Sequence, residues 1–242
     1  RDFGSRLVRF SSDLVFDGCG DGGYVESAPV SPVTIYGQTM AEAEQIILEG
    51  LPSALVLRIP LPMGHSFNGH AGALDWIGSR FRKKLPATLY YDEVRSNIYI
   101  QDIIKVVEYL LDTSCSGLFH LGGPQALSLY QIAQIINRLG GFTADFLKGC
   151  FRNEAAPIPP RAGNVSMDCS KLYRLLPPNM IRPWPLNPKH LPGHATWHHK
   201  HKPEYSSRFM LQHLFGYDLE DEHHHPVHYL PQHILNRHNE VN

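Results

Sequence analysis

The sequence predicts an α/β fold built on a parallel sheet, and two features of its first part point to it. Short apolar segments rich in β-branched residues, Arg6–Ser11 and Ala54–Ile59, have the composition of buried strands. Between them, Tyr36–Glu49 repeats apolar residues at helical spacing, and Gly50 stands where a helix C-cap would. A strand, a loop, a helix and a second strand in this order form the βαβ unit of parallel sheets.

The same alternation continues further along the chain. Asn97–Ile100 has the composition of a short strand and is followed by a helical pattern over Asp102–Leu111. Leu118–Leu121 is a further apolar segment of strand type. Ser128 is a suitable N-cap for a helix over Leu129–Leu139, which two glycines then end.

Composition divides the chain into three parts. Residues 1–60 carry the βαβ unit, and residues 61–176 carry further elements, which we expect to form a smaller α/β substrate domain together with elements that return to the first part. Six prolines between Pro177 and Pro192 exclude a regular helix or central strand, and 12 of the 15 histidines follow Pro177. His194 and His198 have a spacing that suits zinc, but prolines bracket them. We therefore expect residues 177–242 to be an irregular extension without a metal site.

Charge and cysteine content exclude several classes of protein. Lys and Arg number 22 against 23 Asp and Glu, a balance that gives no electrostatic reason to expect nucleic-acid or anionic-membrane binding. No apolar run approaches the roughly 18 residues of a transmembrane helix. The four cysteines form no CxxC pair, so we expect reduced thiols and a cytoplasmic protein.

One stretch carries the residues of a candidate catalytic site. Ser11 and Ser12 end the first predicted strand, a glycine-rich loop follows, and Tyr36 stands on the first turn of the next helix. Ligands of open α/β sheets bind beyond the carboxyl ends of the strands, so we expect a hydroxyl and a phenol to converge there. The phenol of Tyr36 would donate a proton to a substrate carbonyl while Ser12 holds that oxygen. In a purely structural alternative, Ser12 satisfies backbone groups, and Asp13 and Asp17 set turns.

This ordered series resembles the extended short-chain dehydrogenase/reductase superfamily, and within it the sugar-nucleotide reductases typified by dTDP-4-dehydrorhamnose reductase. The resembling residues are Ser11–Gly18, Tyr24–Glu26, Pro32 and Tyr36-Gly37, with further similarity in Arg95–Ile103, Phe119–Ser128 and Asn164–Leu172. The resemblance therefore covers residues 5 to 175. It implies that the chain forms the C-terminal part of a Rossmann-like, doubly wound parallel sheet with a small substrate domain.

The resemblance also implies a function. It is reduction of a 4-keto-deoxysugar nucleotide with NADP or NAD as the cofactor, whose reduced form supplies the hydride, as in dTDP-rhamnose biosynthesis. A homodimer is a further expectation for this chain. Tyr36 is then the general acid and Ser12 the partner of the carbonyl. The implied cofactor-binding residues are Ser11, Tyr36, Arg58, Ile59 and Pro60. The implied substrate-binding residues are Asn68, Arg95, Arg161 and Asn164.

Three departures from the family pattern keep a second function open. The glycine-rich nucleotide fingerprint is absent, and the order of the remaining motifs favours a chain that is part of a longer polypeptide. Met40 stands where the family has a lysine four residues after Tyr36, and Leu14 stands where it often has a tyrosine. Met40 is also a suitable apolar core residue. The alternative is a non-catalytic binding protein on the same fold, as the regulatory subunit of methionine adenosyltransferase resembles these reductases.

Overall fold

The structure, a computed structural model, describes residues 5–64, 66, 72–139, 142–155 and 157–182. These residues form two compact units. Unit 1 comprises the described residues of 1–62, 92–127 and 155–183, and unit 2 those of 63–91 and 128–154. Each unit therefore collects stretches that are far apart in the sequence.

Unit 1 contains the predicted parallel sheet. Its strands are β1 (Val8–Ser12), β2 (Leu55–Ile59) and β7 (Gly117–His120), in the order β1-β2-β7 and all parallel. The strands predicted from the apolar segments are thus confirmed, with small shifts at their ends. In the register, Ser12 lies beside Ile59, so the carboxyl ends of β1 and β2 coincide.

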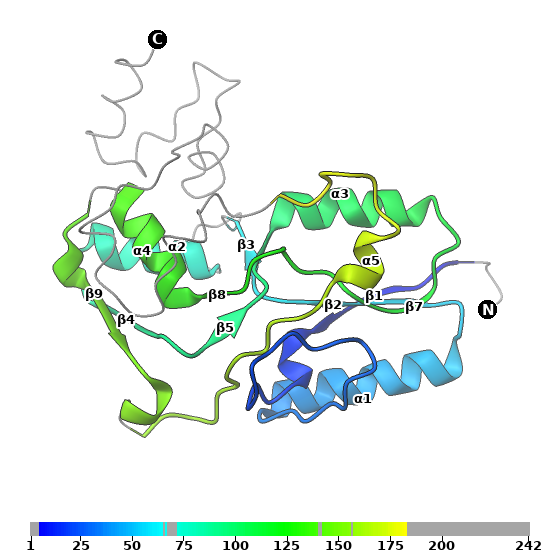
Figure 1. Ribbon diagram of the computed structural model, residues 1–242, viewed down its shortest axis with the longest axis horizontal. Coiled ribbons are helices and arrows are strands. Elements are labelled where there is room, and N and C mark those ends of the chain that lie inside the picture. Colours follow the sequence, from blue (N-terminus) through cyan, green and yellow to red (C-terminus); the bar gives the residue numbers. More distant parts are fainter. Residues whose placement is uncertain (1–4, 65, 67–71, 140–141, 156, 183–242) are drawn as a thin grey trace, which may run out of the picture. The chain divides into compact units, whose positions relative to one another are not determined.

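Two helices cover the opposite faces of this sheet, α1 (Ile35–Gly50) and α3 (Ile100–Leu111) (Figure 1). Helix α1 extends through Gly50, and Leu51 is its C-cap, one residue later than predicted. Helix α3 absorbs the end of the predicted strand over 97–100. The remaining short elements of unit 1 are β5 (Val94–Arg95), β6 (Ile98–Tyr99) and α5 (Ser170–Tyr173).

Buried apolar side chains of unit 1 form two clusters. The cluster under α3 fills the space between that helix and the sheet. Its buried members are Leu55, Leu57, Ile98, Ile103, Val106, Leu110, Phe119, Leu121 and Leu172. The second cluster lies where the glycine-rich loop and residues 162–169 meet, with buried members Val15, Phe16, Ala162, Val165, Met167 and Cys169.

Unit 2 is a small α/β unit whose strands β4 and β9 pair in parallel. The sequence predicts only its helix α4, because the other segments are too short for a clear period. Its elements are α2 (Ala73–Arg82), β4 (Ala87–Tyr90), α4 (Leu129–Leu139), η2 (Ala144–Phe146), β9 (Leu147–Cys150) and η3 (Arg152–Glu154). Two further short strands, β3 (Pro62–Met63) and β8 (Leu127–Ser128), lie where the chain passes between the units.

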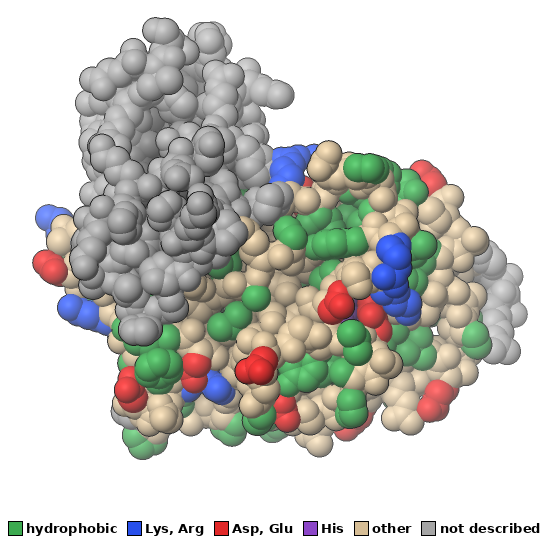
Figure 2. Space-filling model, in the orientation of Figure 1, with side chains coloured by type: hydrophobic (Ala, Val, Ile, Leu, Met, Phe, Trp, Pro, Cys, Tyr) green, Lys and Arg blue, Asp and Glu red, His purple; other side chains and the backbone are tan. Residues whose placement is uncertain are grey.

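The surface carries no single dominant charge on the face shown in Figure 2, where acidic and basic side chains are interspersed with apolar ones. Within the described residues, no helix has the length and apolar character needed to cross a membrane. The same residues contain no cluster of three or more His, Cys, Asp or Glu side chains suited to a metal ion. The histidine-rich segment, with His194 and His198, lies outside the described residues.

Candidate functional site

The carboxyl end of β1 places three polar residues, Ser11, Ser12 and Asp13, in the interior of unit 1. Ser12 Oγ accepts a hydrogen bond from the Leu14 N–H at 3.1 Å and so caps the 3-10 helix η1 (Asp13–Val15). The Ser12 hydroxyl also donates to Asp13 Oδ1 at 3.3 Å. Ser12 thus satisfies a backbone group, as the structural alternative expects, and its catalytic role stays a prediction. Ser11 Oγ is buried and has no hydrogen-bond partner among the described residues.

Tyr36 lies on the first turn of α1, as the sequence predicts. Thr34 Oγ1 caps this helix by accepting the Gly37 N–H at 3.0 Å. Tyr36 is 52% exposed, and its phenol makes no hydrogen bond with the described residues, Ser12 included. Gly37 packs directly against η1, because a Cβ there would collide with the Leu14 carbonyl oxygen. The Tyr-Gly pair thus lets α1 approach the end of β1 closely.

Met40, one turn further along α1, is partly buried against the cluster that contains Val15 and Phe16. Its predicted role as an apolar core residue is therefore confirmed. Its thioether has a second neighbour, because Arg9 Nη2 lies 3.5 Å from Met40 Sδ. Arg9 stands on β1, three residues before Ser12. A guanidinium from the sheet therefore lies beside the position where the family has its lysine.

A group of four charged side chains includes Asp13. The Arg95 guanidinium donates to Asp13 Oδ1 at 2.7 Å and to Glu93 Oε1 at 3.2 Å. Arg161 makes two further hydrogen bonds to Glu93, each 3.0 Å long. Burial raises the pKa of the Asp13 carboxyl, and the Arg95 guanidinium beside it acts in the opposite direction. The structure thus brings together Arg95 and Arg161, two of the predicted substrate-binding residues, through a shared carboxylate.

Asn164, a third predicted substrate-binding residue, holds the glycine-rich loop. Its Nδ2 donates to the Asp21 carbonyl at 2.7 Å, and its Oδ1 accepts the Ser166 N–H at 3.2 Å. A Cβ at Gly22, where φ is +77°, would collide with Asn164 and Ser166. Asp17 Oδ1 accepts the Cys19 N–H and the Tyr24 hydroxyl, so the alternative that Asp17 sets a turn is confirmed.

Arg58, expected near the cofactor, is buried on β2, one residue before the end of the strand, and takes part in a polar network. Its guanidinium makes two short hydrogen bonds to Glu44 of α1, at 2.9 Å to Oε1 and 2.7 Å to Oε2. Arg58 Nη1 also lies 3.3 Å from His120 Nε2, while His120 Nδ1 lies 3.1 Å from the Asp168 carbonyl oxygen. Since a carbonyl accepts and a guanidinium donates, the ring carries its proton on Nδ1 and is neutral. The network joins α1, β2 and β7.

The buried ring predicts a pH dependence of stability. Burial lowers the pKa of His120, and the Arg58 guanidinium acts in the same direction, while Glu26 raises it. The unfolded ring takes up its proton near the ordinary value of 6.5 and the folded ring only at lower pH. The contribution of the neutral ring to the free energy of unfolding is therefore fully present above that value. It decreases as the pH falls below it, by at most about 1.4 kcal/mol per pH unit.

Urea unfolding between pH 7.5 and pH 5.5 measures this dependence. The wild type is expected to lose more stability over this interval than His120→Gln, whose amide does not titrate. Equal losses in the two proteins would contradict the assignment of a neutral His120.

The other predicted residues take different places. Ile59 ends β2 beside Ser12, and Pro60, which is buried, follows it, so both lie at the edge that carries Ser11 and Ser12. Asn68 lies outside the described residues. The cofactor and substrate roles of all these residues stay predictions.

Sequence reasoning missed Glu44 and His120, although one signal for Glu44 was present. Glu44 follows Met40 by four residues and therefore shares the inward face of the helix with it. Arg58 is the one charged residue of the apolar segment Ala54–Ile59. Two charges in buried positions on consecutive elements predict an ion pair, since unpaired buried charges are rare.

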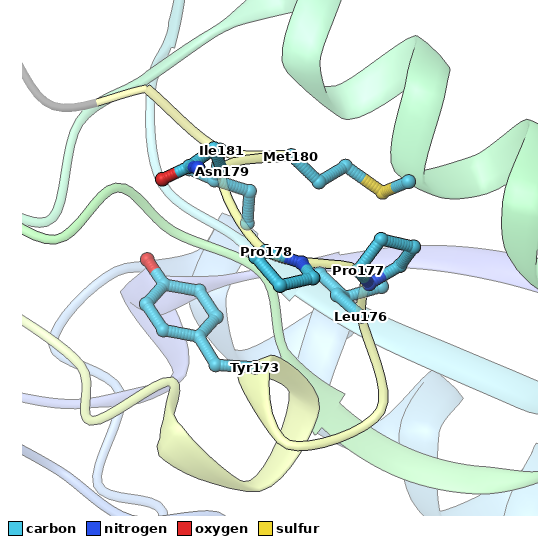
Figure 3. A pocket seen from close by; sticks show the side chains of 7 residues that line it. All are labelled: Tyr173, Leu176, Pro177, Pro178, Asn179, Met180 and Ile181. Carbon is cyan, nitrogen blue, oxygen red and sulfur yellow. The ribbon is translucent and has the colours of Figure 1, made fainter.

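Unit 1 also contains a cavity of about 250 Å³ formed by the end of α5 and the chain that follows it (Figure 3). Its lining residues are Tyr173, Leu176, Pro177, Pro178, Asn179, Met180 and Ile181. The Tyr173 hydroxyl donates to the Gly122 carbonyl at 2.7 Å. No charged side chain is among these lining residues, and the phenol proton of Tyr173 is used in this hydrogen bond.

The family model of the RmlD substrate binding domain matches residues 1–187. The chain belongs to this family. Solved structures share its α/β fold, and the expectation of a Rossmann-like parallel sheet is confirmed. The dTDP-4-dehydrorhamnose reductase of Bacillus anthracis, in complex with NADP, has a TM-score of 0.65 at 20% identity, covering 71% of this chain and 60% of its own. The UDP-glucose 4-epimerase of Thermus thermophilus, with NAD, has a TM-score of 0.59 at 18% identity, covering 70% and 57%.

Curated relatives of this chain include subunits of an enzyme, methionine adenosyltransferase 2. The methionine adenosyltransferase 2 subunit beta of Rattus norvegicus is 29% identical over 178 residues, which are 71% of this chain and 53% of the relative. A probable low-salt glycan biosynthesis reductase of Haloferax volcanii is 27% identical over 124 residues, 50% of this chain and 41% of the relative. The chain thus spans about half the length of the curated relatives it matches.

Proposed function

We propose that this chain serves as a partner-binding subunit on a reductase fold, comparable to the beta subunit of methionine adenosyltransferase 2, rather than as a reductase. One observation carries the proposal. The Ser12 hydroxyl accepts from the Leu14 N–H and donates to Asp13, so its single proton is already used within the protein. A substrate carbonyl would need that proton. The names of the curated relatives that match 71% of the chain support the same function.

Two measurements on the purified chain test this proposal. Titration calorimetry with the catalytic chain of methionine adenosyltransferase 2 should show saturable binding of fixed stoichiometry. NADPH oxidation with a 4-keto-deoxysugar nucleotide should stay at the level of a Tyr36→Phe control. Turnover above that control, without binding to the adenosyltransferase chain, would contradict the proposal.

The second candidate function is the reduction of a sugar nucleotide by a nicotinamide cofactor. The Arg9 guanidinium at Met40 favours it, because a cation beside Tyr36 is part of the family's arrangement. The residues present suit only the nicotinamide end of such a cofactor. Ser11 Oγ is a buried hydroxyl without a partner among the described residues at this edge, whereas the glycine-rich fingerprint for the phosphates is not in the sequence. When bound, the cofactor would supply the hydride.

A further inference from the structure

We infer that Arg9 carries the positive charge of the Tyr36 face of α1, in the place that a lysine at position 40 holds in the resembling reductases. A lysine at position 40 would reach further than Met40 does from the same point of the helix. Tyr36 and Met40 are four residues apart and share one face of the helix. Methionine and lysine have the same unbranched path as far as Sδ or Cδ, and the lysine ammonium lies two bonds further on.

The Arg9 guanidinium lies close to the Met40 thioether. Arg9 Nη2 lies 3.5 Å from Met40 Sδ, and so in the neighbourhood that the ammonium of a lysine at position 40 would reach. The two side chains come from different elements, Arg9 from β1 and Met40 from α1. In this chain the positive charge therefore comes from the strand that ends at Ser12, and not from the helix.

The charge of Arg9 differs from that of four other arginines in unit 1, which are paired with carboxylates. These four are Arg58, Arg95, Arg161 and Arg182. In the described part of the chain, Arg9 pairs with no carboxylate and donates one hydrogen bond, to the Met40 thioether. A thioether is a weak acceptor and carries no charge. The partly buried guanidinium therefore keeps its positive charge uncompensated toward the Tyr36 face.

Two cations cannot occupy this place without repulsion, and this predicts how substitutions combine. Met40→Lys in the wild-type chain should lower the melting temperature by about 2–4 °C. The same substitution in an Arg9→Gln background should lower it by less than about 1 °C. In an Arg9→Lys background the loss should remain, and about 1 M NaCl should remove most of it, because salt screens charge repulsion but leaves packing unchanged.

Gln38→Lys is the matched control, because Gln38 is exposed on the first turns of the same helix. It should have the same small effect in the wild-type chain and in the Arg9→Gln background. Calorimetric melting of the whole chain measures all these variants. An equal loss for Met40→Lys in these two backgrounds would overturn the inference, as would a loss that salt leaves unchanged.

A second measurement rests on the second candidate function. If the wild type oxidises NADPH with a 4-keto-deoxysugar nucleotide, Arg9→Gln should lower kcat/KM roughly tenfold or more, and Arg9→Gln with Met40→Lys should recover part of it. Turnover that is indifferent to Arg9→Gln would overturn the inference. If the wild type shows no turnover, the reductase function fails, while the melting comparison still decides where the charge lies.

Discussion

Replacing Arg58 by methionine is expected to lower the free energy of unfolding by about 3–5 kcal/mol. The substitution keeps an unbranched apolar side chain on β2 but removes the cation that faces Glu44. The Arg58 and Glu44 side chains are only 4% and 5% exposed, with 2.7 Å between Nη2 and Oε2. Without the guanidinium, the Glu44 carboxylate is buried and unpaired, which is among the most costly changes in a protein interior.

Two variants decide whether the unpaired charge is the cause. Arg58→Met combined with Glu44→Leu should recover a large part of the lost stability, because no uncompensated charge then remains. Arg161→Met is the control, because it removes the same kind of charge from an exposed position. The Arg161 side chain is 41% exposed, and Glu93 keeps its ion pair with Arg95. It should cost less than about 1 kcal/mol. Urea unfolding of the four proteins provides the comparison, and a double variant no more stable than Arg58→Met would refute this explanation.

Whether the sequence predicts a feature depends on how far apart along the chain the interacting residues lie. Strands β1 and β2 and helix α1 could be predicted because their periodic apolar patterns are local signals. The network around Arg58 could not be predicted as a whole. Its partner His120 is 62 residues away, and the two meet only because β7 pairs with β2. Glu44 is the exception, since its position beside Met40 was visible in the sequence.

The candidate site shows the same limit. The motif places Ser12 and Tyr36 on the correct elements, but it does not state which hydrogen bonds their side chains make. Ser12 caps η1, and Asn164 holds the glycine-rich loop, because both turn toward backbone groups that become neighbours only after folding. No sequence pattern pointed to Arg9. Its contact with Met40 exists only because α1 packs on the sheet, which brings Met40 Sδ to 3.5 Å from Arg9 Nη2.

Gly37→Ala is expected to lower the free energy of unfolding by about 1–3 kcal/mol, although alanine is the better helix former. Gly37 is buried in α1, and its Cα faces η1 so closely that an added Cβ would collide with the Leu14 carbonyl oxygen. A backbone atom cannot move aside as a flexible side chain can, so the helix itself must shift. The backbone at Gly37 lies outside the left-handed region, so the cost comes from this contact and not from strain.

Gly50→Ala is the control within the same helix, because a Cβ at Gly50 would meet no atom within 4 Å. It should be neutral or stabilising by up to about 1 kcal/mol, as helix propensity predicts. The two substitutions therefore have opposite expected signs in one urea-unfolding experiment. If Gly37→Ala were as well tolerated as Gly50→Ala, the close packing of α1 on η1 would be refuted. The glycine after Tyr36 would then have no role in holding the tyrosine near the carboxyl end of β1.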